Sequence, residues 1–161
     1  LLSGSDDHLI NLWDVGAAKA THSNLEPTQT FNHHTDVVED VAWHRKNESV
    51  FGSVGDDKKI LLWDTRQTPE KPMHSIDGHT QDINTIDFNP FNEHLFVTGS
   101  ADKSVALWDK RNLKIKLHSF VQHTNEVCLG NLSVCLDKVD PTLLLHEIIN
   151  PGIGRSVESF Q

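Results

Sequence analysis

Short runs of apolar residues, many of them alternating with polar ones and all bounded by polar turns, predict an all-β chain. Apolar residues at every second position mark a strand with one buried face, and short continuous apolar runs mark strands buried on both faces. The strands that this pattern predicts lie at residues 41–43, 50–54 and 59–63, and again at 86–88, 95–99 and 104–108. Between the second and third strand of each set lies a short turn, GDDK or ADKS. In such turns an Asp side chain can bond the backbone.

The two sets of strands are copies of one repeating unit. In each unit an Asp lies 23 residues after a leading His and a Trp lies 29 residues after it, with a small hydroxyl residue between the His and the Asp. The leading residues His34, His79 and His123 recur every 44 to 45 residues, and Trp-Asp ends both complete units. This period and ending are typical of a propeller blade. The sequence therefore predicts a partial β-propeller with four-stranded antiparallel blades.

The four spaced residues of a unit can form one chain of polar contacts. The His would bond the Asp of the turn, and the hydroxyl would link the His to the indole N–H of the Trp. Such a network stabilises a blade only when every member is satisfied. We therefore interpret these residues as structural tetrads and not as catalytic groups. They are Ser3, Asp7 and Trp13 in the first unit, His34, Ser53, Asp57 and Trp63 in the second, and His79, Thr98, Asp102 and Trp108 in the third.

The repeat period also predicts how the 161 residues are organised. The length leaves room for about three and a half repeats, whereas propellers close with four to eight blades. We expect repeats at about 1–31, 32–77 and 78–122, with a fourth beginning at 123. Residues 1–126 are thus expected to form a propeller fragment. Residues 127–161 contain no further Asp turn or Trp-Asp pair, and are expected to be an aberrant, non-repeat tail of uncertain origin.

Composition excludes several classes of function. The formal charge of −9, from 14 basic and 23 acidic residues, opposes direct binding of nucleic acid and favours a basic partner. No apolar run is long enough to span a bilayer. We find no phosphate loop or nucleophile motif, so neither an enzyme nor a cofactor is expected. Cys128 and Cys135 suggest neither a disulfide scaffold nor a zinc ribbon, and His33, His34 and His44 do not complete a metal site.

A further set of polar residues lies three or five positions after each leading His. They are Glu39, Asp82, Asn84 and Glu126. Since they begin the innermost strands, they should converge at one mouth of the central channel. Carboxylates there can bind Lys and Arg through charge-assisted hydrogen bonds. The alternative interpretation is a solvated rim of an acidic protein.

Several stretches match more than a generic repeat. They are LLSGSDDHLINLWD at 1–14, HHTDVVEDVAWH at 33–44, ESVFGSVGDDKKILLWDTR at 48–66 and FNPFNEHLFVTGSADKSVALWDKRNLKIKLHSF at 88–120. Through residues 1 to about 126 the chain resembles the WD-repeat family, in which the same His, Ser/Thr, Asp and Trp form a structural tetrad. Within that family it resembles the histone-binding chaperones of the retinoblastoma-binding protein and multicopy-suppressor-of-Ira group.

The resemblance implies a seven-bladed propeller in the intact protein and a location in the nucleus. It also implies that the protein is a subunit shared by chromatin assembly, Polycomb repressive, nucleosome remodelling and histone deacetylase complexes. Core histones and basic histone-tail peptides would then be the partners. The residues after each leading His would match part of the family's acidic top face.

Two Trp-Asp-x-Arg motifs suggest a different interaction role. Residues 63–66 and 108–111 fit the WDxR pattern of substrate receptors of cullin-type ubiquitin ligases. Arg66 and Arg111 could instead pair with neighbouring carboxylates of the blades. A histone-binding scaffold and a ligase receptor are therefore the two alternatives that the sequence supports.

Overall fold

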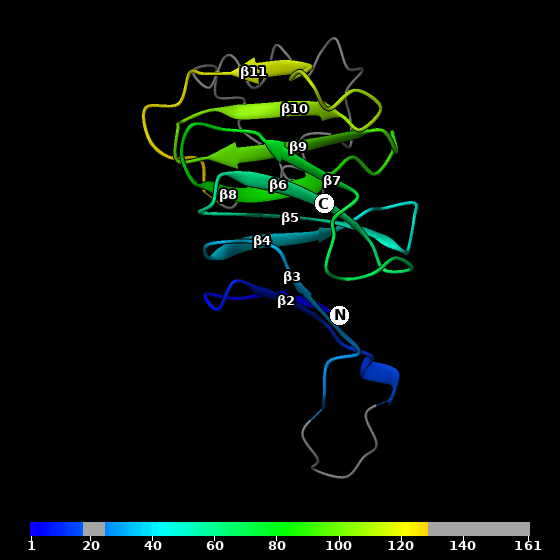
Figure 1. The fold of residues 1–161 in the computed structure, drawn as a ribbon. Helices are drawn as coiled ribbons and strands as arrows, with labels where there is room; N and C mark the ends of the chain where they lie inside the picture. Colours follow the sequence, from blue (N-terminus) through cyan, green and yellow to red (C-terminus); the bar gives the residue numbers. More distant parts are fainter. Residues whose placement is uncertain (18–24, 129–161) are drawn as a thin grey trace, which may run out of the picture.

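The computed structural model describes residues 1–17 and 25–128, which form three antiparallel sheets arranged one after another (Figure 1). Apart from the 3-10 turn η1 (Val15–Ala17), these residues contain no helix. Most of the expected tail, residues 129–161 with Cys135, lies outside the described residues. The strands are β1 (Leu2–Gly4), β2 (Leu9–Leu12), β3 (Gln29–Asn32), β4 (Val38–Trp43), β5 (Val50–Gly55), β6 (Lys59–Asp64), β7 (His74–Asp77), β8 (Ile83–Phe88), β9 (Leu95–Ser100), β10 (Val105–Asp109) and β11 (His118–Phe120).

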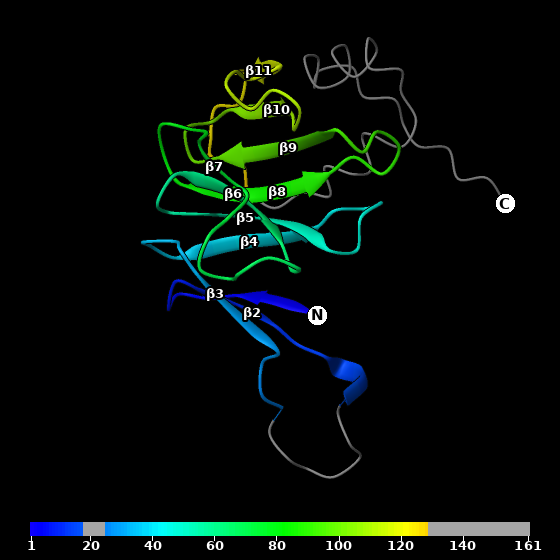
Figure 2. The same ribbon diagram turned by 45° about the vertical axis from the view of Figure 1, so that its right-hand side comes forward.

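Each sheet is one blade, built from strands that follow one another in the chain. Blade 1 contains β1, β2 and β3, blade 2 contains β4 to β7, and blade 3 contains β8 to β11. The turned view in Figure 2 shows blade 2 lying between blade 1 and blade 3. The all-β class, the antiparallel blades and the partial propeller predicted from the sequence are confirmed.

Two buried clusters fill the spaces between neighbouring blades. Ile10 and Phe31 of blade 1 pack with Phe51, Leu61 and Trp63 of blade 2. A second cluster joins blades 2 and 3, and β6 contributes Ile60 and Leu62 to it. Successive side chains of a strand point to opposite faces. Strand β6 is therefore apolar almost throughout because it packs against a blade on each side.

Blades 2 and 3 repeat the same aromatic pair across two strands. Phe51 and Trp63 are cross-strand partners whose rings stack at 5.9 Å. Phe96 and Trp108 are partners whose rings stack at 6.2 Å. Each pair places the indole of the Trp-Asp motif inside its blade, beside the hydroxyl residue of β5 or β9.

The Asp turns share one backbone conformation. The residue after the tetrad Asp has a positive φ in every blade: 67° at His8, 64° at Lys58 and 69° at Lys103. The Asp side chain accepts the N–H of the next residue but one, at 3.0 to 3.1 Å. The predicted bond between the Asp side chain and its own turn is confirmed.

Candidate functional site

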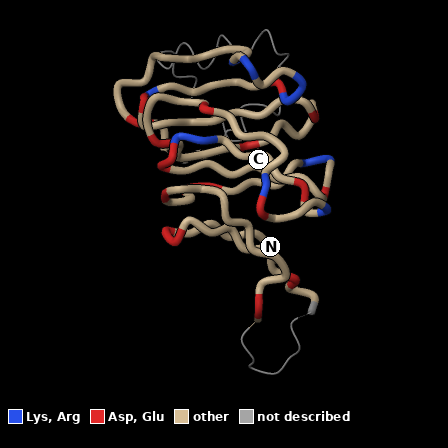
Figure 3. Tube along the Cα trace, in the orientation of Figure 1, with Lys and Arg blue, Asp and Glu red and all other residues tan. Residues whose placement is uncertain are grey.

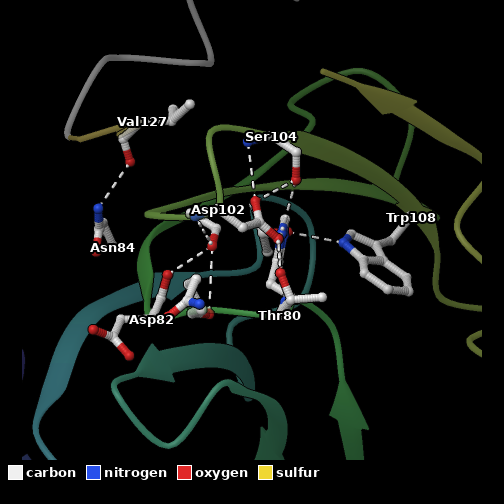
Figure 4. Close-up of polar contacts among 11 residues, drawn as sticks. Thr80, Asp82, Asn84, Asp102, Ser104, Trp108 and Val127 are labelled. Atoms are coloured by element: carbon white, nitrogen blue, oxygen red, sulfur yellow. Dashed lines mark hydrogen bonds and ion pairs between the residues drawn. The ribbon is translucent and has the colours of Figure 1, made fainter. Parts of the chain in front are cut away.

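A buried chain of hydrogen bonds crosses blade 3. Trp108 Nε1 donates to Thr98 Oγ1 at 2.9 Å, and Thr98 Oγ1 lies 2.8 Å from His79 Nε2. His79 Nδ1 lies 2.9 Å from Asp102 Oδ2. Figure 4 shows Asp102, Ser104 and Trp108 within this network. The Asp102 carboxylate can only accept, so the proton of a neutral His79 ring sits on Nδ1 and points at it. Nε2 then accepts from the Thr98 hydroxyl, which in turn accepts from the indole.

Burial and hydrogen bonding set the charge of this chain. Burial lowers the pKa of His79, although the hydrogen bond to Asp102 opposes the change. Burial alone would raise the pKa of Asp102, but hydrogen bonds from Ser104, the Thr80 N–H and His79 outweigh it and lower this pKa. At neutral pH the pair is a neutral imidazole facing a carboxylate.

Blade 2 contains the same arrangement. Ser53 Oγ lies 2.7 Å from His34 Nε2 and accepts from Trp63 Nε1 at 2.9 Å. His34 Nδ1 lies 2.8 Å from Asp57 Oδ2. Burial alone would raise the pKa of Asp57, but the hydrogen bond and the charge interaction with His34, together with hydrogen bonds from the Lys59 and Thr35 N–H groups, outweigh it and lower this pKa. The His34 side chain is 0% exposed. The network therefore has no face on which a substrate could meet the imidazole.

Blade 1 contains the Ser, Asp and Trp of a tetrad. Trp13 Nε1 donates to Ser3 Oγ at 2.9 Å. Asp7 accepts the N–H of Leu9 within its own turn. The three predicted residues of this unit thus take the positions of their counterparts in blades 2 and 3.

Carboxylates from all three blades gather at the end of the blades where the Asp turns lie. We call Asp6, Glu39, Asp56 and Asp82 the acidic mouth. Partial burial raises the pKa of Glu39, and Asp56, Asp6 and Asp82 raise it further by repulsion. Burial also raises the pKa of Asp56, with repulsion from Asp82 next. Figure 3 shows acidic segments along this end, on the left of the view. Like charges held together favour binding of a cation.

Two β-bulges lie at the edge of the acidic mouth. The register between β4 and β5 shifts between Val38 and Asp40, so Glu39 is the extra residue. The register between β8 and β9 shifts between Ile83 and Thr85, so Asn84 is the extra residue. A bulge re-aims the side chain of the extra residue. Both residues follow their leading His by five positions, so the bulge belongs to the repeating unit.

Asn84 and Glu126 lie toward the start of the fourth unit. Asn84 Nδ2 donates to the Val127 carbonyl at 3.1 Å (Figure 4). Val127 N donates to Ser100 O at 3.0 Å, as Val38 N donates to Ser5 O at 3.2 Å. Val127 thus lies beside blade 3 as Val38 lies beside blade 1. Glu126 is exposed next to it. The structure therefore brings Glu39 and Asp82 together, and places Asn84 beside Val127 and Glu126 at the start of the fourth unit.

Two members of the acidic mouth, Asp6 and Asp56, were not predicted from the sequence. Each directly precedes the tetrad Asp of its turn. Their shared position within the repeat could have identified them, but in blade 3 the same position holds Ala101. The position is acidic in two units of three, so the repeat alone did not single it out.

A third unpredicted residue, Asp40, joins blades 2 and 3. Its Oδ2 accepts from Thr85 Oγ1 at 2.9 Å and from the Ile86 N–H at 3.0 Å. Burial raises the pKa of Asp40 although these hydrogen bonds act to lower it. Its role is to connect β4 with β8 beneath the acidic mouth.

The two WDxR motifs have identical local structures. Arg66 forms two bonds to Asp64, at 2.9 and 2.6 Å. Arg111 forms equivalent bonds to Asp109, at 3.0 and 2.6 Å. Hydrogen bonds from the Arg side chains lower the pKa of Asp64 and of Asp109 to about 2. Each Arg thus pairs with the carboxylate of its own motif while its side chain stays 67% or 64% exposed.

The described residues hold no group of three or more His, Cys, Asp or Glu side chains arranged to bind a metal ion. Within the same ranges, no helix is long and apolar enough to cross a membrane.

Two segments of the chain match a known family. Residues 25–64 and residues 70–109 each match WD40, the WD domain or G-beta repeat. Each match begins before the outer strand of one blade and ends with the Trp-Asp strand of the next. A repeat therefore spans two blades, and the covalent chain itself joins neighbouring blades.

Proposed function

Since the chain is a WD-repeat protein, a class that serves as scaffolds for protein interactions, we propose that it is a histone-binding scaffold subunit. In this proposal the acidic mouth binds a basic histone-tail peptide without chemical change to it. The protein acts in the nucleus, within chromatin assembly, remodelling, Polycomb or deacetylase complexes. The likeness of residues 1 to about 126 to the histone-binding chaperones supports this choice of partner.

The observation that carries the proposal is the crowding of carboxylates at the acidic mouth. Glu39 and Asp56 come from one blade, and Asp6 and Asp82 come from the blades on either side. Their repulsion raises the pKa of both Glu39 and Asp56. A Lys or Arg side chain placed among them would relieve this repulsion and donate charge-assisted hydrogen bonds to the carboxylates. A histone tail offers several such cations along one extended strand.

The test is titration of the chain with a fluorescent basic histone-tail peptide, followed by anisotropy. Replacing Glu39 by Gln together with Asp82 by Asn should weaken binding at least tenfold, because each charged hydrogen bond is worth roughly 1.5 to 3 kcal/mol. The affinity of the unaltered chain should also fall as salt is added.

The matched control is Glu48→Gln, which makes the same Glu-to-Gln change in an exposed loop between β4 and β5, at the opposite end of blade 2. It should bind like the unaltered chain. If the double variant keeps its circular dichroism spectrum and its full affinity, the acidic mouth is not the histone site. If Glu48→Gln lost as much affinity as the double variant, the loss would come from the change in net charge and not from the acidic mouth.

The WDxR motifs favour a second candidate, a substrate receptor of a cullin-type ubiquitin ligase. The observation behind it is that Arg66 and Arg111 are both held in a fixed orientation and largely exposed. A rigid Arg loses little freedom on binding, which suits an interface. A pull-down with the ligase adaptor should fail for Arg66→Ala with Arg111→Ala, while the histone peptide should bind as before.

A further inference from the structure

A groove of about 580 Å³ lies between β7 and the loop that follows β10. Residues 74–77 of β7 form one wall, and residues 110–114 form the other. None of these residues belongs to the acidic mouth. The groove joins blades 2 and 3 on the side of the outer strands, whereas the mouth lies at the start of the inner ones.

One wall of the groove is an open sheet edge. Strand β7 ends its four-stranded sheet and pairs with β6 alone. Gly78 N donates to Lys58 O, so the next pair toward the N-terminus, Asp77 with Lys59, is a non-hydrogen-bonded pair. By the same alternation Ser75 and Asp77 direct their backbone N–H and C=O groups away from β6. An extended segment could therefore add to β7 as a further strand.

The opposite wall is cationic although the chain as a whole is acidic. Lys110, Arg111 and Lys114 line the groove, and Asp77 is the one carboxylate in its lining. Arg111 is already paired with Asp109, and Lys110 Nζ lies 3.1 Å from His44 Nε2, so Lys114 is the cation with most capacity for a ligand. Figure 3 shows this concentration of Lys and Arg beside the loop after β10.

The groove also has an apolar floor. The Ile76 side chain is 9% exposed and belongs to the core between blades 2 and 3. Leu113, on the facing loop, packs against the same core. Ile115, two residues farther on, is 65% exposed. Aliphatic side chains of a ligand would find partners here, and acidic ones would find them on the lysines.

We propose that this groove binds an extended segment of another protein in which aliphatic and acidic residues alternate, and that the segment adds as a strand to β7. Backbone bonds to Ser75 and Asp77 supply part of the affinity. Lys110 and Lys114 select acidic side chains, which the acidic mouth repels. The chain can then hold a basic and an acidic segment at once, on two separate surfaces.

The first experiment titrates the full chain with a short capped peptide of alternating Val and Glu, observed by ¹H–¹⁵N correlation spectra. The amide signals of Ser75 and Asp77 should move, and the affinity should fall at least tenfold in Lys114→Glu. The same peptide with Lys in place of Glu should not bind the groove. No binding of the Val-Glu peptide, or signal changes confined to residues outside 74–77 and 110–114, would overturn the proposal.

The matched control is Lys103→Glu, an identical charge change at an exposed position in the Asp turn of the same blade. It should keep the full affinity, and equal losses in the two variants would overturn the proposal. A second variant, Ser75→Pro, removes an outward N–H that the sheet does not use. It should weaken the Val-Glu peptide severalfold and leave histone-peptide binding unchanged. Unaltered Val-Glu binding in folded Ser75→Pro would exclude strand addition.

Discussion

Thr98→Val tests whether the tetrad of blade 3 stabilises the fold through its hydrogen bonds or only through its shape. Val has nearly the shape of Thr but no hydroxyl. Thr98 is 0% exposed, and its hydroxyl accepts from Trp108 and donates to His79. The substitution therefore leaves an indole N–H and an imidazole nitrogen buried without partners. At roughly 1 to 3 kcal/mol for each such group, the free energy of unfolding should fall by about 2 to 6 kcal/mol.

Thr98→Ser is the matched control for this change. Ser keeps the hydroxyl, and Ser53 makes the same two contacts in blade 2. Only a buried methyl is lost, which costs about 1 kcal/mol. The expected order of stability is therefore the unaltered chain, then Thr98→Ser, then Thr98→Val by a wide margin.

The assay is equilibrium unfolding in urea followed by far-ultraviolet circular dichroism. A second, local measurement is the exchange of the Trp108 indole proton, which should become faster in Thr98→Val and stay slow in Thr98→Ser. If Thr98→Val unfolds within about 0.5 kcal/mol of the unaltered chain at an equal urea dependence, the hydrogen bonds of the tetrad do not stabilise the blade.

Three further predictions concern the contacts between and below the blades. Burial lowers the pKa of His44 from its ordinary value of 6.5, so the stability it contributes is complete above that pH and is lost as the pH falls. His44→Asn should keep the turn contacts, because Asn89 makes the equivalent contacts in blade 3. Since Asn does not titrate, the melting temperature of this variant should fall less between about pH 8 and about pH 5 than that of the unaltered chain. Asp40→Ala should lower the free energy of unfolding by about 2 kcal/mol in urea, since it removes the acceptor of two bonds that join blade 2 to blade 3. Arg66→Ala should return the pKa of Asp64 from about 2 toward 3.8 in an NMR titration, while its effect on stability should stay below about 1 kcal/mol because the pair is exposed.

The strands were predictable because their signal is local and repeated. In β6 every residue from Ile60 to Trp63 is apolar, and the structure packs alternate side chains against different blades. The tetrad was predictable for the same reason, since all four of its residues lie within one repeat. Two copies of the same spacing identified both features without knowledge of the neighbouring blades.

The acidic mouth was only partly predictable because it is assembled across three blades. Glu39 and Asp82 were expected from their distance to the leading His residues. Asp6 and Asp56 were missed, since their proximity to Glu39 depends on how the blades stack and not on any spacing within a repeat. The bulge at Glu39 was missed for a related reason. An extra residue in one strand is visible only against its partner strand.

In the Asp turn, one Asp stabilises the blade and the residue before it belongs to the proposed binding surface. In blade 2, Asp57 turns inward to His34, and its side chain is 2% exposed. Asp56, one residue earlier, belongs to the acidic mouth, and its N–H donates to Val37 O at 3.0 Å. Repulsion among the carboxylates of the mouth would spread them apart if their turns were free to move. The inward hydrogen bonds of Asp57 hold this turn in place. The tetrad therefore keeps the carboxylates of the acidic mouth close together despite their repulsion, and this closeness favours binding of a cation. A variant that breaks the tetrad, such as Ser53→Ala, should therefore weaken histone-peptide binding although Ser53 is 0% exposed and cannot touch the peptide.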